Sequence, residues 1–129
     1  MRGASALNRL LTELPDAEIQ VQVVWEPVLR TDVAAPLSGV LALLQDRRVL
    51  QYWDPDLRLS GDLVRAANRD PARYRLEEPF PPDFVAWDLV AVFGKTTRWD
   101  ADLPVPLYYG GPVVDVIEET KKGLSAALR

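Results

Sequence analysis

Apolar residues recur along the chain with two alternating periods, which predicts a succession of helices and strands. From Ala4 to Asp16, leucines fall at positions i, i+3, i+4 and i+7 on one helical face, and Pro15 ends the pattern. Over residues 18–29, apolar residues alternate with glutamines, as in a strand, until Pro27 interrupts the alternation. A helix followed by a strand is therefore expected at the start of the chain.

The middle of the chain repeats this order. Residues 37–44 have helical spacing, with Pro36 suited to a first helical position and Gly39 limiting the length of the helix. Residues 48–53 have strand character and stop at the turn pair Asp54-Pro55. A short helix and a second strand are the expected result.

The second half adds a helix, two strands and a final helix. Ser60 is predicted to be the N-cap of the first of these helices. Residues 84–93 are apolar on both faces apart from Asp88, which is typical of a strand in the middle of a covered sheet. A strand over residues 105–109, paired with it as a hairpin, and a helix over 113–129 complete the predicted elements.

This order predicts an α/β protein. Alternating helices and strands imply parallel strands joined by right-handed crossovers, and the closing strand, strand and helix imply an antiparallel C-terminal hairpin. We therefore expect a three-layer α/β/α sandwich around a mixed four-stranded sheet. A chain of 129 residues fits a single domain that spans residues 1–129.

Composition narrows the class of protein. The chain is 48% apolar and 26% charged, as in ordinary globular proteins, and its apolar runs are far shorter than the roughly 18 residues of a membrane span. The first residues lack the apolar core of a signal peptide, so we expect a cytoplasmic protein that does not bind membranes. A net charge of −4, with scattered Lys and Arg, argues against a nucleic-acid partner.

Two absent residue types exclude several chemistries. The chain has no Cys, which excludes a thiolate nucleophile, a disulfide and Cys-based metal sites, and no His, which excludes imidazole catalysis and imidazole zinc sites. No segment matches a phosphate-binding or dinucleotide-binding glycine motif. We therefore predict no catalytic residue, no metal site and no cofactor, and a chain without catalytic activity is favoured.

The segments VQVVWEPVL, YWDPDLRLSGDLVRAA and FVAWDLVAVFG, in this order before a C-terminal helix, resemble the thioredoxin-like superfamily. The resemblance is closest to its TlpA/peroxiredoxin-like members. It implies the thioredoxin-like fold, but the family's redox chemistry belongs to cysteines that this chain lacks. Ala86-Trp87 also stands where the family has a cis-proline. No catalytic residue is carried over, and the resemblance implies a non-redox member.

The register of this resemblance leaves two interpretations. In one, the strand that ends at Trp25 is itself the central strand, and the sheet is complete. In the other, Met1 falls near the family's second redox cysteine, and the chain lacks the family's first strand and redox motif. It would then be a truncated or late-start form of a thiol-disulfide oxidoreductase or peroxiredoxin-like protein.

All four tryptophans are followed directly by a carboxylate, in the pairs Trp25-Glu26, Trp53-Asp54, Trp87-Asp88 and Trp99-Asp100. In open α/β sheets, ligands bind beyond the carboxyl ends of the parallel strands. The candidate ligand-binding residues at that edge are Trp25, Asp32, Asp54, Trp87 and Asp88. Converging carboxylates would bind Mg²⁺ or Ca²⁺, or raise one another's pKa for acid/base chemistry.

The pairs also have a purely structural interpretation. Successive strand residues face opposite sides, so each Trp packs inward while its acidic neighbour points outward. Asp54 would then form a turn with Pro55 and Asp56. Asp88, inside an apolar strand, would need a buried partner, for which Arg30, Arg98 or a tyrosine hydroxyl are the candidates.

These observations favour a non-redox thioredoxin-like module that binds an unknown protein or small-molecule partner, and they are compatible with a homodimer. The alternatives are the truncated redox protein and a carboxylate-dependent, metal-assisted enzyme.

Overall fold

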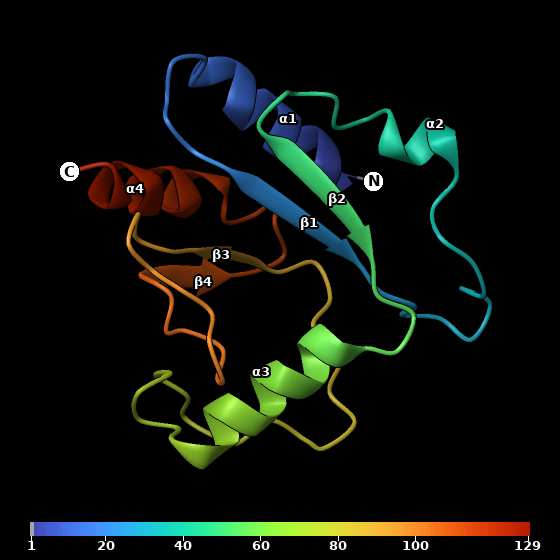
Figure 1. Ribbon diagram of the computed structural model, residues 1–129, viewed down its shortest axis with the longest axis vertical. Coiled ribbons are helices and arrows are strands. Elements are labelled where there is room, and N and C mark those ends of the chain that lie inside the picture. Colours follow the sequence, from blue (N-terminus) through green and yellow to red (C-terminus); the bar gives the residue numbers. More distant parts are fainter. Residues whose placement is uncertain (1) are drawn as a thin grey trace.

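The computed structural model describes residues 2–129, which form an α/β protein of mixed helices and strands, as the sequence predicts. Four helices and four strands alternate along these residues in the predicted order (Figure 1). They are α1 (Arg2–Glu13), β1 (Val21–Trp25), α2 (Ser38–Leu41), β2 (Val49–Trp53), α3 (Arg58–Arg69), β3 (Val90–Val92), β4 (Tyr108–Gly110) and α4 (Ile117–Ala127).

The strands form two pairs rather than the single four-stranded sheet that we expected. Strands β1 and β2 are parallel, with Val21 opposite Val49 and Trp25 opposite Trp53. Strands β3 and β4 are antiparallel, and no strand of residues 2–129 hydrogen-bonds one pair to the other. Figure 1 shows the two pairs fanned apart, with β1 and β3 as the inner strands.

Strand β3 is much shorter than the apolar run over residues 84–93 predicts. Asp88 lies in the left-handed region at φ 52°, which an extended strand does not accommodate. Before it, the Ala86 N–H bonds to the Ser60 hydroxyl at 2.8 Å and not to another strand. The strand therefore begins only at Val90, and the prediction that Asp88 lies inside a buried strand was wrong.

The helices are divided between two parts of the molecule. Helix α4 packs on β3 and β4, and α1 packs on α4. Helix α3 lies apart from them (Figure 1) and has its own apolar cluster, in which Ala66 and Ala67 meet Tyr74 and Leu103 from the loops. The Tyr74 hydroxyl donates to the Leu103 carbonyl oxygen, which satisfies the polar end of this buried side chain.

Arg48 fastens the end of α1 to the start of β2. Its guanidinium donates to the carbonyl oxygens of Leu14 at 2.5 Å and Leu11 at 2.8 Å, and Nη2 reaches the Asp46 carboxylate at 2.7 Å. The last carbonyl groups of a helix lack intrahelical donors, and the Arg48 guanidinium supplies donors for them at the end of α1. The guanidinium also holds the pKa of the Asp46 carboxyl far below its ordinary value.

We expect Arg48→Lys to destabilise the fold by about 1–3 kcal/mol, because an ammonium group cannot reproduce the fork of bonds to both carbonyls and the carboxylate. The Arg48 side chain is 9% exposed, so water does not replace the lost bonds. Urea denaturation followed by tryptophan fluorescence measures the change.

The neighbouring Arg47 is exposed and provides a matched control. Arg47→Lys should change the unfolding free energy by less than about 0.5 kcal/mol. Equal effects of the two substitutions would contradict the role given to Arg48.

Candidate functional site

The register of β1 and β2 brings two of the four Trp-acid pairs together. Trp25 lies opposite Trp53, so Glu26 and Asp54 leave the sheet at the same edge. The Asp54 N–H donates to the Trp25 carbonyl oxygen at 2.9 Å, which extends the ladder one residue beyond the strands. This edge is the carboxyl end of the parallel pair, where α/β proteins bind ligands.

Glu26 and Asp54 both bind the first turn of α3. The Leu59 N–H donates to Asp54 Oδ2 at 2.9 Å, and the Ser60 N–H donates to Glu26 Oε1 at 3.1 Å. The first N–H groups of a helix have no intrahelical partner and carry a partial positive charge, so carboxyl oxygens are favourable there. These two Trp-acid pairs therefore mark strand ends that cap a helix.

Ser60 joins three elements at this edge. Its hydroxyl donates to Glu26 Oε2 at 2.5 Å and accepts the N–H of Ala86 at 2.8 Å. The side chain is buried inside the first turn of α3, so the prediction that Ser60 is the N-cap was wrong. Leu57, at φ 54°, occupies the N-cap position, and side chains from the strand ends do the capping.

Burial raises the pKa of the Glu26 carboxyl, and the nearby Asp54 carboxylate raises it further, against the lowering effect of the bonds from Ser60. Burial would also raise the pKa of Asp54. Bonds from the backbone N–H groups of Leu59 and Arg58, together with the Glu26 carboxyl, outweigh it and lower that pKa. Glu26 is therefore the first of the two carboxyls to take up a proton as the pH falls, and Asp54, beside the helix N-terminus, keeps its charge into more acidic solution.

The other sequence candidates are placed separately from this pair. Asp32 Oδ2 accepts the N–H groups of Val28 at 3.0 Å and Leu29 at 2.8 Å, so it closes its own loop. The Trp25 indole N–H donates to Gln51 Oε1 at 3.0 Å within the parallel pair. Both side chains are engaged in holding the local structure.

The surroundings of Asp88 differ from those that the sequence predicts. It is exposed, and Oδ1 accepts the N–H of Val113 at 3.3 Å, in place of the expected arginine or tyrosine partner. The structure thus couples Asp54 with Glu26 and places Asp88 beside the segment before α4. Within residues 2–129, no three acidic side chains come close enough together to hold a metal ion.

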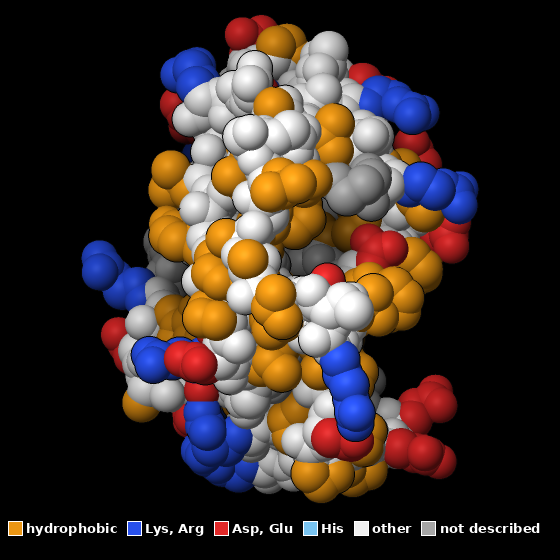
Figure 2. All heavy atoms as spheres, turned by 90° about the vertical axis from the view of Figure 1, so that its right-hand side faces the viewer, with side chains coloured by type: hydrophobic (Ala, Val, Ile, Leu, Met, Phe, Trp, Pro, Cys, Tyr) orange, Lys and Arg blue, Asp and Glu red, His pale blue; other side chains and the backbone are white. Residues whose placement is uncertain are grey.

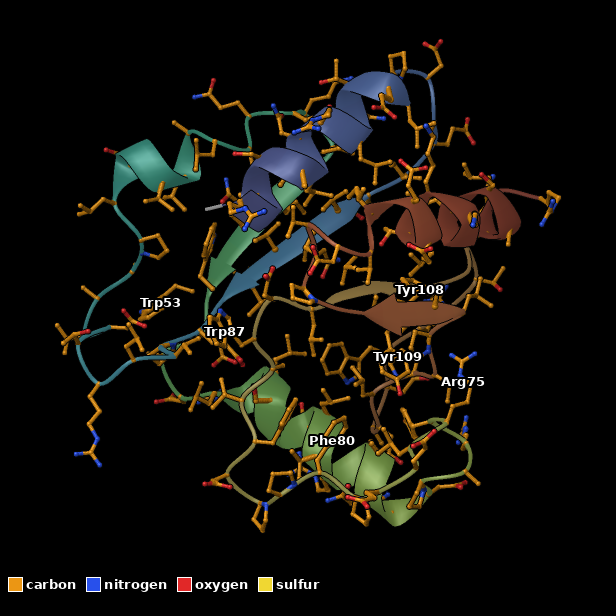
Figure 3. All side chains as sticks on the ribbon, turned by 180° about the vertical axis from the view of Figure 1, so that it is seen from behind. Trp53, Arg75, Phe80, Trp87, Tyr108 and Tyr109 are labelled. Atoms are coloured by element: carbon orange, nitrogen blue, oxygen red, sulfur yellow. The ribbon has the colours of Figure 1, made fainter. Side chains whose placement is uncertain are left out.

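Trp87 remains as an exposed aromatic side chain at this edge. It follows Ala86, which is bonded to Ser60, and 71% of its surface is exposed. Figure 3 shows Trp53 and Trp87 toward the same end of the molecule, away from Tyr108 and Tyr109. The role of Trp87 in binding stays a prediction.

The loop that follows β1 adds apolar side chains. Leu29, Val33 and Leu37 are all exposed, Val33 to 88%. Figure 2 shows the side of the molecule on which this loop and α2 lie, with apolar side chains down its middle and charged ones at its margins. We call Leu29, Val33, Leu37 and Trp87 the carboxyl-end surface.

Two hollows of the described residues lie away from this surface. One, of about 400 Å³, lies between residues 11–15 and 46–48, and a smaller one of about 120 Å³ lies between α1 and α4. No helix in residues 2–129 has the length and apolar character to cross a membrane. Comparisons with protein-family models, curated proteins and solved structures find no match to this chain.

Sequence reasoning included Glu26 in the Trp-acid pattern but not among the candidate site residues, and it gave Ser60 a different role. The signal that identifies Glu26 is the pairing of Trp25-Glu26 with Trp53-Asp54 across the parallel strands. Nothing in the sequence shows that Ser60 reaches Glu26, because the two are 34 residues apart.

We predict a specific pH dependence for the Glu26 carboxyl. A pKa raised by folding gives a stabilising contribution that is complete below the unfolded pKa and is lost as the pH rises through the folded one. The urea midpoint of the wild type should therefore fall relative to that of Glu26→Gln as the pH rises above the ordinary glutamate value of about 4.5. The lowered pKa of Asp54 acts oppositely, and its contribution is lost only in more acidic solution.

Glu78→Gln, which changes an exposed carboxyl, should keep the wild-type profile. Parallel profiles for the wild type and Glu26→Gln would show that the proton is not held by Glu26.

Proposed function

We propose that this chain is a non-redox, thioredoxin-like module that binds a protein partner through its carboxyl-end surface. The order of elements supports the fold: two parallel strands, a helix, an antiparallel strand pair and a C-terminal helix. Thiol chemistry has no cysteine to act through in this sequence. Binding therefore explains the features of this edge better than redox catalysis.

The observation that carries the proposal is the contrast between polar and apolar groups at the edge. The polar side chains at this edge form hydrogen bonds with one another and with the backbone of α3; they are those of Glu26, Asp54 and Ser60. Trp87 and Val33, by contrast, leave most of their surface in water. Exposed aromatic and aliphatic side chains above a rigid polar base are what a protein partner buries as the centre of an interface.

The shape of the surface favours a protein over a small molecule. Small ligands bind in concave pockets that cover most of their surface. The two hollows described above lie beside α1, and neither Trp87 nor the loop that holds Val33 lines them. Neither hollow is lined by a residue of the carboxyl-end surface, whose exposed apolar side chains suit the large contacts made between proteins.

Selection of a random peptide library on the immobilised wild-type chain tests the proposal. Enriched peptides should lose affinity for Trp87→Ala by roughly 30-fold, because tryptophans at interface centres contribute about 2 kcal/mol or more. Val33→Asp should weaken the same peptides, since it places a charge in the apolar contact. Fluorescence anisotropy of labelled peptides gives the dissociation constants.

Trp99→Ala is the matched control, because Trp99 is also exposed but lies in the loop after β3, outside the carboxyl-end surface. It should leave peptide affinity unchanged. Peptides that bind Trp87→Ala as well as the wild type, or a selection that enriches no sequence, would count against the proposed surface.

A further inference from the structure

Strand β2 is paired on one side only. In the register with β1, the backbone groups of Leu50 and Tyr52 point toward β1, and those of Val49, Gln51 and Trp53 point away. Within residues 2–129, the N–H and C=O of Gln51 and of Trp53 and the C=O of Val49 have no backbone partner. A row of unmet donors and acceptors therefore lies along the outer edge of β2.

This edge lacks the usual protection against pairing with another strand. Natural edge strands carry a charge, a proline or a bulge that prevents such pairing. The sequence of β2, VLQYW, contains none of these, and Leu50 and Tyr52 on one face are 43% and 48% exposed. The inner edge of β1 differs, because it faces β3 inside the molecule, whereas the outer edge of β2 faces outward (Figure 1).

We propose that β2 is the interface of a homodimer, in which the β2 strands of two copies pair antiparallel about a two-fold axis at Gln51. In this register, the two Gln51 residues exchange both N–H···O bonds. The Trp53 N–H of each copy donates to the Val49 carbonyl oxygen of the other. Four hydrogen bonds form, and they use four of the five unpaired backbone groups of each β2. The Trp53 carbonyl oxygen receives no bond, because the Val49 N–H already donates to the Asp46 carbonyl oxygen.

The same register also pairs the exposed side chains of β2. Leu50 of one copy lies opposite Tyr52 of the other, and symmetry makes this contact twice. These are positions of the kind without direct backbone bonds, where cross-strand side chains approach most closely. Two half-exposed apolar residues are thus buried against each other by one two-fold operation.

Charge selects the antiparallel direction and a second copy as the occupant. The strand is preceded by Arg47, which is exposed, and is followed by Asp54-Pro55-Asp56. Antiparallel pairing places Arg47 of one copy opposite Pro55 of the other, between the two carboxylates. Parallel pairing would instead bring Arg47 beside Arg47. The basic start and acidic end of β2 make the strand complementary to itself.

The dimer goes beyond the proposed function, because it uses the outer edge of β2 and not the carboxyl-end surface. A charge-exchange series tests both the interface and its register, with sedimentation velocity over a dilution series as the readout. Leu50→Lys and Tyr52→Glu, each alone, should raise the dimer dissociation constant by roughly tenfold or more, since each changes two symmetric contacts. The double variant L50K/Y52E should dimerise again, because each Lys then faces a Glu.

Leu107→Lys is the matched control, since Leu107 is 51% exposed and lies outside β2. It should dimerise like the wild type, and so should Trp87→Ala, whose loss of peptide binding is a separate event. A wild-type chain that stays monomeric at every concentration overturns the proposal. So does a dimer that Leu50→Lys leaves intact, a double variant that fails to recover, or a dimer that depends on Trp87.

Discussion

The alignment of Trp25 with Trp53 across the parallel strands is the constraint on which the rest of this structure depends. It fixes where the next residue of each strand emerges, and both of those residues are acidic. Their carboxyl groups meet the first N–H groups of α3, which have no partner in the helix itself. A shift of one strand by one residue would turn one of these acids to the other face of the sheet.

Ser60 extends this arrangement to the C-terminal half. Its hydroxyl donates to Glu26 and accepts the N–H of Ala86, so the segment before β3 is fixed to the end of β1 without any ladder between the strand pairs. The hydrogen bonds of Ser60 thus connect the two strand pairs, which the ladder of a continuous sheet would otherwise do. This explains how carboxyl groups can lie at a half-buried site: their hydrogen bonds compensate for their partial removal from water.

The sequence predicted the order of the elements and the types of strand pairing, because both follow from local periodicity and from connection length. The predicted length of β3 was too great, because the apolar residues over 84–93 have the pattern of a strand even where the backbone is not extended. The departure arises at Asp88, which has a positive φ and whose carboxylate accepts the N–H of Val113, a contact between distant segments that leaves no local pattern. The roles of Glu26 and Ser60 were missed for the same reason, because capping from 34 residues away leaves no local pattern.

The division of the apolar core explains why the surface carries so much apolar area. Helix α3 buries its apolar face against the loops around Tyr74 and Leu103, so it does not cover the β1–β2 pair. Leu50 and Tyr52 therefore stay half exposed on a strand whose sequence would suit a covered sheet. A protein that uses a helix for a second cluster leaves an apolar sheet face exposed to water and a strand edge whose backbone groups are free to pair with another strand. Contact with another protein would remove this apolar surface from water. Strand β2 and the loop after β1, which carry exposed apolar side chains, are therefore the parts of this fold that association would stabilise.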